Sequence, residues 1–211
     1  MSKVDIIDLG YKDYQEALDI QEKLFTERSL GKIKNTILFV EHPPVITVGI
    51  RGKKTNILLD RNYLEKHNIK IYDIKRGGDV TYHGPGQLVG YFIFDLKDYN
   101  RDVKRFIFNI EEIFIRILKK LFNINAVRED GKYTGIWVDN KKITAIGVQI
   151  RKYITMHGFA FNINTNLDHF KWIVPCGIED RGVTSLENII LKRTDFEFIK
   201  MEIVKEVKDI F

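Results

Sequence analysis

The stretch RGGDVTYHGPGQ, residues 76–87, places four glycines and one proline around a five-residue run of alternating polar and apolar side chains. The alternation predicts a short strand over residues 79–83, with Thr81 and His83 on the same side. Glycine costs roughly 0.5–1 kcal/mol relative to alanine inside regular structure, so these glycines indicate unusual backbone angles or a group that approaches the backbone closely. From this stretch alone, a tight β-hairpin and a binding loop are both open interpretations.

Predicted strands flank the glycine-rich stretch, at residues 69–74 before it and residues 88–96 after it. The clearest helix follows, because apolar residues from Phe106 to Leu121 recur at helical spacing with charged residues off that face. Working outward, the pattern predicts a strand at 4–9, a helix from 14 to about 30, extended runs within 36–49 broken by His42-Pro43-Pro44, strands at 136–138, 142–150 and 154–163 with a turn at Asp139-Asn140, a capping box over 184–187 and a last helix after Thr194-Asp195. No repeat or linker separates these elements, so residues 1–211 are expected to form one α+β domain in which mixed and antiparallel sheets pack against helices.

Composition limits the classes of function. The chain has 211 residues, of which 44% are hydrophobic, so it is long enough to bury a substantial core. A net charge of +5 favours acidic partners, but Lys and Arg are dispersed without interleaved aromatic residues, which argues against a nucleic-acid-binding domain. Residues 1–20 carry charges throughout, and no later stretch is apolar for long enough to span a bilayer. We therefore expect a cytoplasmic protein that binds neither nucleic acid nor membrane.

The glycine spacing matches neither of the two common nucleotide-binding loops. Gly77-Gly78 and Gly84-Pro85-Gly86 fit neither the GxxxxGK[ST] pattern nor GxGxxG. ATP binding through either loop is therefore unsupported.

Cys176 is the single cysteine of the chain, and it lies between Pro175 and Gly177. One cysteine excludes an internal disulfide and a cysteine-rich zinc site. A buried thiol is the commoner case, but a proline and a glycine on either side predict a turn, which is an unusual place for a core residue and favours a reactive thiol. With a pKa near ~8.5, such a thiol needs a basic partner at neutral pH.

Two side chains could supply that base. His157 falls on an apolar side of its predicted strand, with Thr155, Phe159, Phe161 and Ile163, where a structural histidine is the commoner outcome. Strand alternation places Lys142 on a second apolar side, with Thr144, Ile146, Val148 and Ile150. It places Lys141 on the other side, with Ile143, Ala145, Gly147 and Gln149. A lysine on an apolar side either extends to water or has a lowered pKa, and the sequence leaves both open.

Three separated stretches together resemble one family. They are RGGDVTYHGPGQLVGY at 76–91, KKITAIGVQI at 141–150 followed by TMHGFAFNI at 155–163, and VPCGIEDRGVTSL at 174–186. In this order and spacing they resemble the octanoyltransferases of lipoate biosynthesis, within the biotin/lipoate ligase superfamily, over nearly the whole chain. The resemblance implies the catalytic-domain fold of that superfamily for residues 1–211.

The resemblance also implies an acyltransferase reaction. An octanoyl or lipoyl group would move from the phosphopantetheine of acyl carrier protein to a lysine on the lipoyl domains of 2-oxoacid dehydrogenases or the glycine-cleavage H protein. Cys176 would carry the group as a thioester and Lys142 would act as acid and base, without ATP or metal. The residues implied to bind the substrate are Arg76, Gly77, Gly78, Asp79, Val80, Thr81, Tyr82, His83, Ala145, Ile146, Gly147, Gly158, Phe159 and Ala160.

Three alternatives remain beside this interpretation. An ATP-dependent lipoate or biotin ligase would share the fold, but the chain lacks a Gly-Arg-Gly-Arg loop and has a turn cysteine that such ligases do not need. An amidotransferase that moves lipoyl groups between proteins would share the cysteine and lysine chemistry. The alternative without catalysis is a basic nucleic-acid-binding domain.

Overall fold

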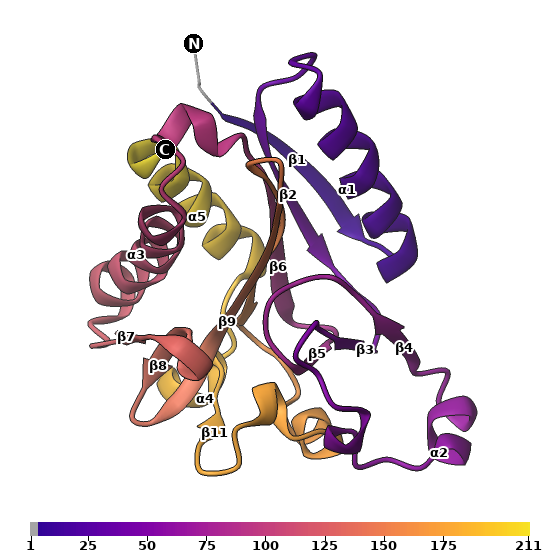
Figure 1. The fold of residues 1–211 in the computed structure, drawn as a ribbon. Helices are drawn as coiled ribbons and strands as arrows, with labels where there is room; N and C mark the ends of the chain where they lie inside the picture. The colour runs from indigo at the N-terminus through magenta and orange to yellow at the C-terminus, as the bar shows by residue number, and fades with distance from the viewer. Residues whose placement is uncertain (1–3) are drawn as a thin grey trace.

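Two β-sheets organise the structure, a computed structural model that describes residues 4–211 (Figure 1). Within these residues the larger sheet contains eight strands in the order β1-β2-β6-β10-β9-β8-β7, with β11 beside β9. The smaller sheet has the order β4-β3-β5. The strands are β1 (Val4–Tyr11), β2 (Asn35–Glu41), β3 (Val45–Val48), β4 (Lys70–Asp73), β5 (Val80–His83), β6 (Gln87–Ile93), β7 (Val127–Glu129), β8 (Gly135–Val138), β9 (Lys141–Arg151), β10 (Ile154–Asn162) and β11 (Gly182–Val183).

Helices cover both faces of the larger sheet. In Figure 1, α3 and α5 lie on one face and α1 lies on the other. The helices are α1 (Tyr14–Ser29), α2 (Arg61–Lys66), α3 (Val103–Phe122), α4 (Leu186–Ile190) and α5 (Phe196–Ile210). This arrangement confirms the α+β class with mixed sheets packed against helices, because β1–β2 and β3–β4 pair in parallel while β6, β10 and β9 pair antiparallel. None of the helices in residues 4–211 is long and apolar enough to cross a membrane.

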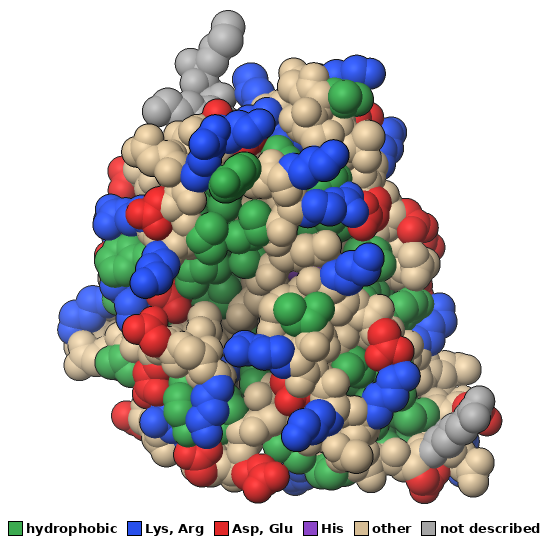
Figure 2. Space-filling view, viewed as in Figure 1, with side chains coloured by type: hydrophobic (Ala, Val, Ile, Leu, Met, Phe, Trp, Pro, Cys, Tyr) green, Lys and Arg blue, Asp and Glu red, His purple; other side chains and the backbone are tan. Residues whose placement is uncertain are grey.

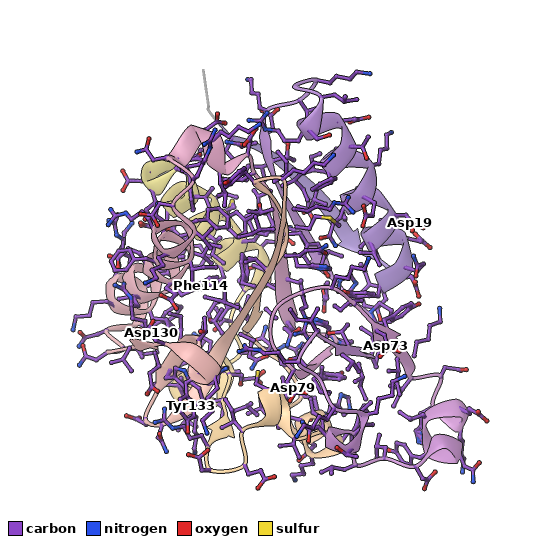
Figure 3. All side chains as sticks on the ribbon, viewed as in Figure 1. Asp19, Asp73, Asp79, Phe114, Asp130 and Tyr133 are labelled. Atoms are coloured by element: carbon purple, nitrogen blue, oxygen red, sulfur yellow. The ribbon has the colours of Figure 1, made fainter. Side chains whose placement is uncertain are left out.

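The main core lies between the larger sheet and helices α3 and α5. Asp102 begins α3 by accepting a hydrogen bond from the backbone N–H of Arg105, and the helix ends at Asn123 in the left-handed conformation. The apolar face between these caps is largely buried, as the sequence predicts, but Glu111, one of the charged residues expected off that face, is buried with it. Phe114, labelled in Figure 3, has its ring centroid 4.7 Å from that of Phe159 on β10, which fixes the helix across the sheet.

The smaller sheet packs against a second hydrophobic core with one face, and its other face is directed toward the cavity described below. Val80 and Tyr82 are buried in this second core. Thr81 and His83 point to the opposite side, as the alternation in the sequence predicts. The sheet therefore presents only every second residue of β5 to the centre of the molecule.

Local signals in the sequence have mixed outcomes. The turn at Asp139-Asn140 is confirmed, because both residues are left-handed, with φ of 46° and 64°. The capping box at 184–187 is wrong by one residue: Ser185 caps α4 by accepting from the N–H of Asn188 at 3.2 Å. The N–H of Thr184 donates to Lys142 O at 2.9 Å, so Thr184 continues the pairing of β11 with β9 and α4 begins one residue later.

Candidate active site

Cys176 lies in a single 3₁₀ turn, η5 (Pro175–Gly177), as the flanking proline and glycine predict. Its φ of 57° is left-handed, an uncommon conformation for a residue with a side chain. The turn lies near Asp79, which holds a neighbouring segment by accepting a hydrogen bond from Asn56 Nδ2 at 2.8 Å. Figure 3 shows Asp79 where β5 meets the segment that carries this turn. The cysteine is half-buried, so its sulfur is held in place and still reachable.

Lys142 is the basic group that reaches this sulfur. Its Nζ lies 3.6 Å from Cys176 Sγ and donates to Thr134 O at 3.1 Å. The same Nζ lies 4.8 Å from the centroid of the Trp137 ring, and the residue is 6% exposed. Lys141, by contrast, is exposed. The structure thus brings a thiol and an amine together from segments 34 residues apart.

The strand alternation used to place Lys142 is wrong. β8 pairs Ile136 with Thr144 but Trp137 with Lys142, so Ile143 is an extra residue that bulges from β9. Beyond the bulge the alternation reverses, and Lys142 lies on the side of Trp137 rather than with Ile146, Val148 and Ile150. Lys142 is buried because of the bulge, and Lys141 is directed outward by the same cause.

A small cavity, partly open to solvent, extends inward from Cys176. Eleven of the fourteen residues expected to bind substrate line it: Arg76, Gly77, Gly78, Thr81, His83, Ala145, Ile146, Gly147, Gly158, Phe159 and Ala160. Val80 and Tyr82 do not, because they face the second core. Asp79 lines an adjoining groove that also contains Arg51, Lys132, Lys142 and Cys176. Cavity and groove therefore meet at the sulfur.

Four lining residues were not among those expected, namely Tyr14, Val89, Tyr91 and His157. Tyr14 comes from α1, which carries no motif, whereas Val89 and Tyr91 lie on β6 at the end of the stretch 76–91 that carries the family resemblance. His157 was assigned to the side of Phe159, and that assignment is wrong. Its φ of 59° breaks the alternation, its N–H donates to Gln21 on α1, and its ring lies 6.1 Å from that of Tyr91.

The glycines of the opening stretch allow two backbones to approach. The N–H of Gly77 donates to Val148 O at 2.9 Å, joining the loop that leads into β5 to β9 of the larger sheet. A Cβ on Gly147 would lie 2.8 Å from Gly77 O, closer than side chains tolerate. The group that comes close to the glycines here is therefore β9 itself.

Arg76 holds the loop before β5 through hydrogen bonds of its side chain. Its guanidinium is buried and donates to Thr47 O at 3.0 Å, to Thr47 Oγ1 at 2.9 Å and to Gly77 O at 2.9 Å. Its Nε is buried without a hydrogen-bond partner among the described residues. Burial lowers the pKa of Arg76, and the nearby Cys176 partly offsets this shift by raising it.

Three buried histidines are neutral: His83 and His157 line the cavity, and the ring of His42 lies 5.9 Å from that of His83. His42 Nδ1 donates to Lys12 O at 2.8 Å, so its Nε2 accepts from the Tyr91 hydroxyl at 2.7 Å. Burial lowers the pKa of His42 to about 4 and those of His83 and His157 to about 3. In residues 4–211 no three His, Cys, Asp or Glu side chains are grouped so that they could hold a metal ion.

These histidines make folding stability depend on pH. Because their folded pKa values lie below the unfolded value of about 6.5, the unfolded chain binds more protons at mildly acidic pH. Their contribution is fully present above about pH 6.5 and is lost as pH falls toward 4. Burial raises the pKa of Glu111 to about 7, so near pH 5.5 the folded chain binds about one proton there that the unfolded chain does not. This proton partly offsets those that the unfolded chain binds at the histidines. We expect the free energy of unfolding to fall by about 3 kcal/mol per pH unit near pH 5.5.

Urea unfolding between pH 5 and 7 measures this slope. Replacing His83 with glutamine removes one titrating group and should reduce the slope by about 1.4 kcal/mol per pH unit. A slope that is flat, or that does not change in His83→Gln, would contradict the assignment of neutral histidines.

Comparisons with known proteins agree with this geometry. Residues 13–208 match the family model of the lipoyl protein ligase A/B catalytic domain. The chain is 54% identical over 208 residues to an octanoyltransferase of Caldicellulosiruptor bescii, covering 99% of this chain and 90% of that protein. It is 46% identical to an octanoyltransferase of Desulforamulus reducens, covering 99% and 91%.

Solved structures share the fold at low identity. A bipartite lipoate protein ligase of Thermoplasma acidophilum superposes with a TM-score of 0.72 at 15% identity, covering 100% of this chain and 84% of that chain. A lipoate-protein ligase A bound with ATP superposes with a TM-score of 0.73 at 16% identity, covering 99% and 85%. With the family model and the relatives in sequence, these matches lead to one conclusion: the chain belongs to the lipoyl protein ligase A/B catalytic-domain family, as an acyltransferase of the octanoyltransferase type.

Proposed function

We propose that this octanoyltransferase carries the octanoyl group as a thioester on Cys176 between an acyl carrier protein and a lysine of a lipoyl domain. The observation that carries the proposal is the 3.6 Å separation of Lys142 Nζ and Cys176 Sγ at the meeting point of cavity and groove. The cavity offers an apolar place for the acyl chain, and the groove offers an approach for the group that bears it.

The first half of the reaction forms the acyl-enzyme. Neutral Lys142 takes the proton of Cys176, and the resulting thiolate attacks the carbonyl carbon of the octanoyl thioester. The tetrahedral intermediate collapses with cleavage of the bond to the phosphopantetheine sulfur. Lys142, now an ammonium, returns its proton to that sulfur, so the donor leaves as a thiol.

The second half transfers the group to nitrogen. The amine of the acceptor lysine attacks the thioester on Cys176, and the thiolate of Cys176 leaves as the amide forms. The proton lost by the attacking nitrogen passes to Lys142 and then restores the thiol. Since the donor thioester is already activated, the proposed chemistry uses neither nucleotide nor metal.

Backbone N–H groups are candidates to stabilise the oxyanion of each intermediate. The sequence suggested Gly77, Gly78 and Gly147. The N–H of Gly77 donates to Val148 O in the structure, which removes it from this set. Gly78 and Gly147 remain, and both line the cavity beside Cys176.

The partners in this proposal are acidic proteins, and the groove has basic residues to meet them. Arg51, Lys132 and Lys142 line it. Figure 2 shows Lys and Arg side chains spread over this face among acidic and hydrophobic ones, without the continuous basic stripe of a nucleic-acid site. The proposed donor is octanoyl-acyl carrier protein, and the proposed acceptors are lipoyl domains of 2-oxoacid dehydrogenases and the glycine-cleavage H protein.

Intact-protein mass spectrometry tests the proposal. Mixed with octanoyl-acyl carrier protein in the absence of nucleotide, the protein should gain one octanoyl group that neutral hydroxylamine releases and that a peptide map places on Cys176. Addition of a lipoyl domain should then move the group to that domain. No gain in mass, or a gain only with free octanoate and ATP, would overturn the proposal in favour of a ligase. Acylation by an octanoylated lipoyl domain but not by the carrier protein would favour an amidotransferase.

A further inference from the structure

We propose that Tyr91 on β6 limits the length of the acyl chain that the enzyme accepts, because it closes the inner end of the cavity that begins at Cys176. This inference rests on the proposed function, in which the chain enters the cavity as a thioester on that sulfur. Tyr91 lines the cavity and is 3% exposed. It is not among the residues that the family resemblance implies as substrate-binding.

Two rows of paired residues form the floor of the cavity. In one row, Gly147 on β9 pairs with Gly158 on β10, and Gly158 pairs with Tyr91 on β6. The second row, in the same strand order, consists of Ala145, Ala160 and Val89. All six residues line the cavity. From β9 toward β6, each row therefore begins with two glycines or two alanines and ends with a larger side chain.

The cavity becomes deeper from β9 toward β6. Cys176 and Gly147 line both the cavity and the groove, whereas among the described residues no member of β10 or β6 lines the groove. Neighbouring strands lie about 4.8 Å apart, so β6 is roughly 10 Å from β9. An extended alkyl chain gains about 1.25 Å per bond, so an octanoyl group spans roughly 9 Å. The distance from the β9 end of the floor to Tyr91 therefore matches the length of this group.

The cover of the cavity comes from α1 and the smaller sheet, which Figure 1 shows on the same side of the larger sheet. Tyr14 on α1 and Thr81 and His83 on β5 line the cavity from there. The rings of Tyr14 and His83 are buried and stacked, with centroids 6.1 Å apart. A chain bound to Cys176 is thus enclosed between this cover and the floor of glycine and alanine.

The ring of Tyr91 is held in place by polar and aromatic contacts. Its hydroxyl donates to His42 Nε2 at 2.7 Å, and His42 Nδ1 donates to Lys12 O at 2.8 Å. Its centroid lies 6.0 Å from that of His42 and 6.1 Å from that of His157. Leu38 on β2, which pairs with Tyr91 from the other side, is fully buried. The end wall is therefore fixed, and its one polar side-chain atom is already paired.

Acylation of Cys176 by carrier proteins that bear chains of different length tests this inference. In the wild type, the second-order rate constant should be about tenfold or more lower for decanoyl than for octanoyl, because the longer chain meets the ring. Tyr91→Leu opens the end wall to the extra methylenes. Each methylene removed from water contributes about fourfold, so the decanoyl-to-octanoyl ratio should rise about tenfold or more. Intact-protein mass spectrometry of competing donors measures this ratio.

Three further variants keep the result interpretable. Tyr91→Phe keeps the ring and removes the hydroxyl, so it should retain the wild-type ratio although His42 loses a partner. Leu38→Ala truncates the side chain one strand farther from Cys176, and it should lower stability without changing the ratio. Tyr91→Met keeps an apolar side chain that fills irregular space, and it replaces the leucine variant if that variant does not fold. An unchanged ratio in the folded variant that lacks the ring, or an equal rise in Leu38→Ala, would overturn the inference.

Alkyl methanethiosulfonates measure the depth of the cavity without acyl transfer. The thiolate of Cys176 attacks the sulfur that bears the alkyl chain, a mixed disulfide forms and methanesulfinate leaves. A heptyl reagent places as many atoms beyond Cys176 Sγ as an octanoyl group does. The nonyl-to-heptyl rate ratio should rise about tenfold in Tyr91→Leu, and an unchanged ratio would contradict the role of Tyr91. Failure of the wild type to take an octanoyl group from the carrier protein is a separate result, which overturns the proposed function.

Discussion

Replacing Cys176 by alanine is expected to abolish the octanoyl adduct and to lower transfer to a lipoyl domain by about 10³-fold or more, because no other group in the site can hold the acyl chain between two carriers. The rate is measured by single-turnover transfer from octanoyl-acyl carrier protein, followed by mass spectrometry of the acceptor. Alanine retains the left-handed turn at the same conformational cost as cysteine, so the free energy of unfolding should change by less than about 1 kcal/mol.

Cys176→Ser is the matched control, because it keeps the size of the side chain and changes its nucleophilicity. Its hydroxyl occupies nearly the same position but is a far weaker nucleophile at neutral pH. Any octanoyl group it gains will be an oxygen ester, which resists the mild hydroxylamine treatment that cleaves the wild-type thioester. If Cys176→Ala transfers octanoate at close to the wild-type rate, the group passes directly between the two proteins and the thioester proposal is wrong.

Lys142→Arg is expected to lower the rate of acyl-enzyme formation by about 10²–10⁴-fold, whereas Lys141→Arg should change it little. Arginine remains protonated above pH 12, so it cannot accept the proton of Cys176. Its planar guanidinium also differs in shape from the ammonium group, which in Lys142 lies between Thr134 O and the Trp137 ring. Lys141 is exposed and reaches neither group.

Stopped-flow acylation of the two variants, with unfolding midpoints measured alongside, separates loss of the base from loss of the fold. Because both substitutions keep the positive charge, equal losses in the two variants would mean that the assignment of Lys142 as the base is wrong. A larger loss in Lys141→Arg would place the base one residue earlier.

Much of the architecture can be predicted from local pattern. The helix over Phe106 to Leu121 has a strong apolar period, and α3 forms there with caps at both ends. The turn at Cys176 follows from Pro175 and Gly177, whose backbone preferences act within three residues. These signals succeed because they depend on neighbours in sequence.

The rest of the site depends on contacts that no local pattern encodes. The bulge at Ile143 is set by pairing with β8, and it reverses the side on which Lys142 lies. The left-handed φ of His157 depends on Gln21, which is 136 residues away in sequence. Tyr14 enters the cavity wall because α1 packs across β6 and β10. The bulge, rather than strict alternation, decides which of the two lysines meets the thiol.

Because cavity and groove meet at Cys176, donor and acceptor proteins must approach the sulfur from the same side. The hydrogen bond from Gly77 N–H to Val148 O holds the loop before β5 against β9, and the groove lined by Arg51 and Lys132 leads to the sulfur. Under the proposed chemistry, donor and acceptor use this approach in turn and are never bound together. The octanoyl group therefore remains on Cys176 after the donor has left and until the acceptor binds. The supply of unmodified acceptor, rather than any affinity between the two carriers, sets the length of that wait.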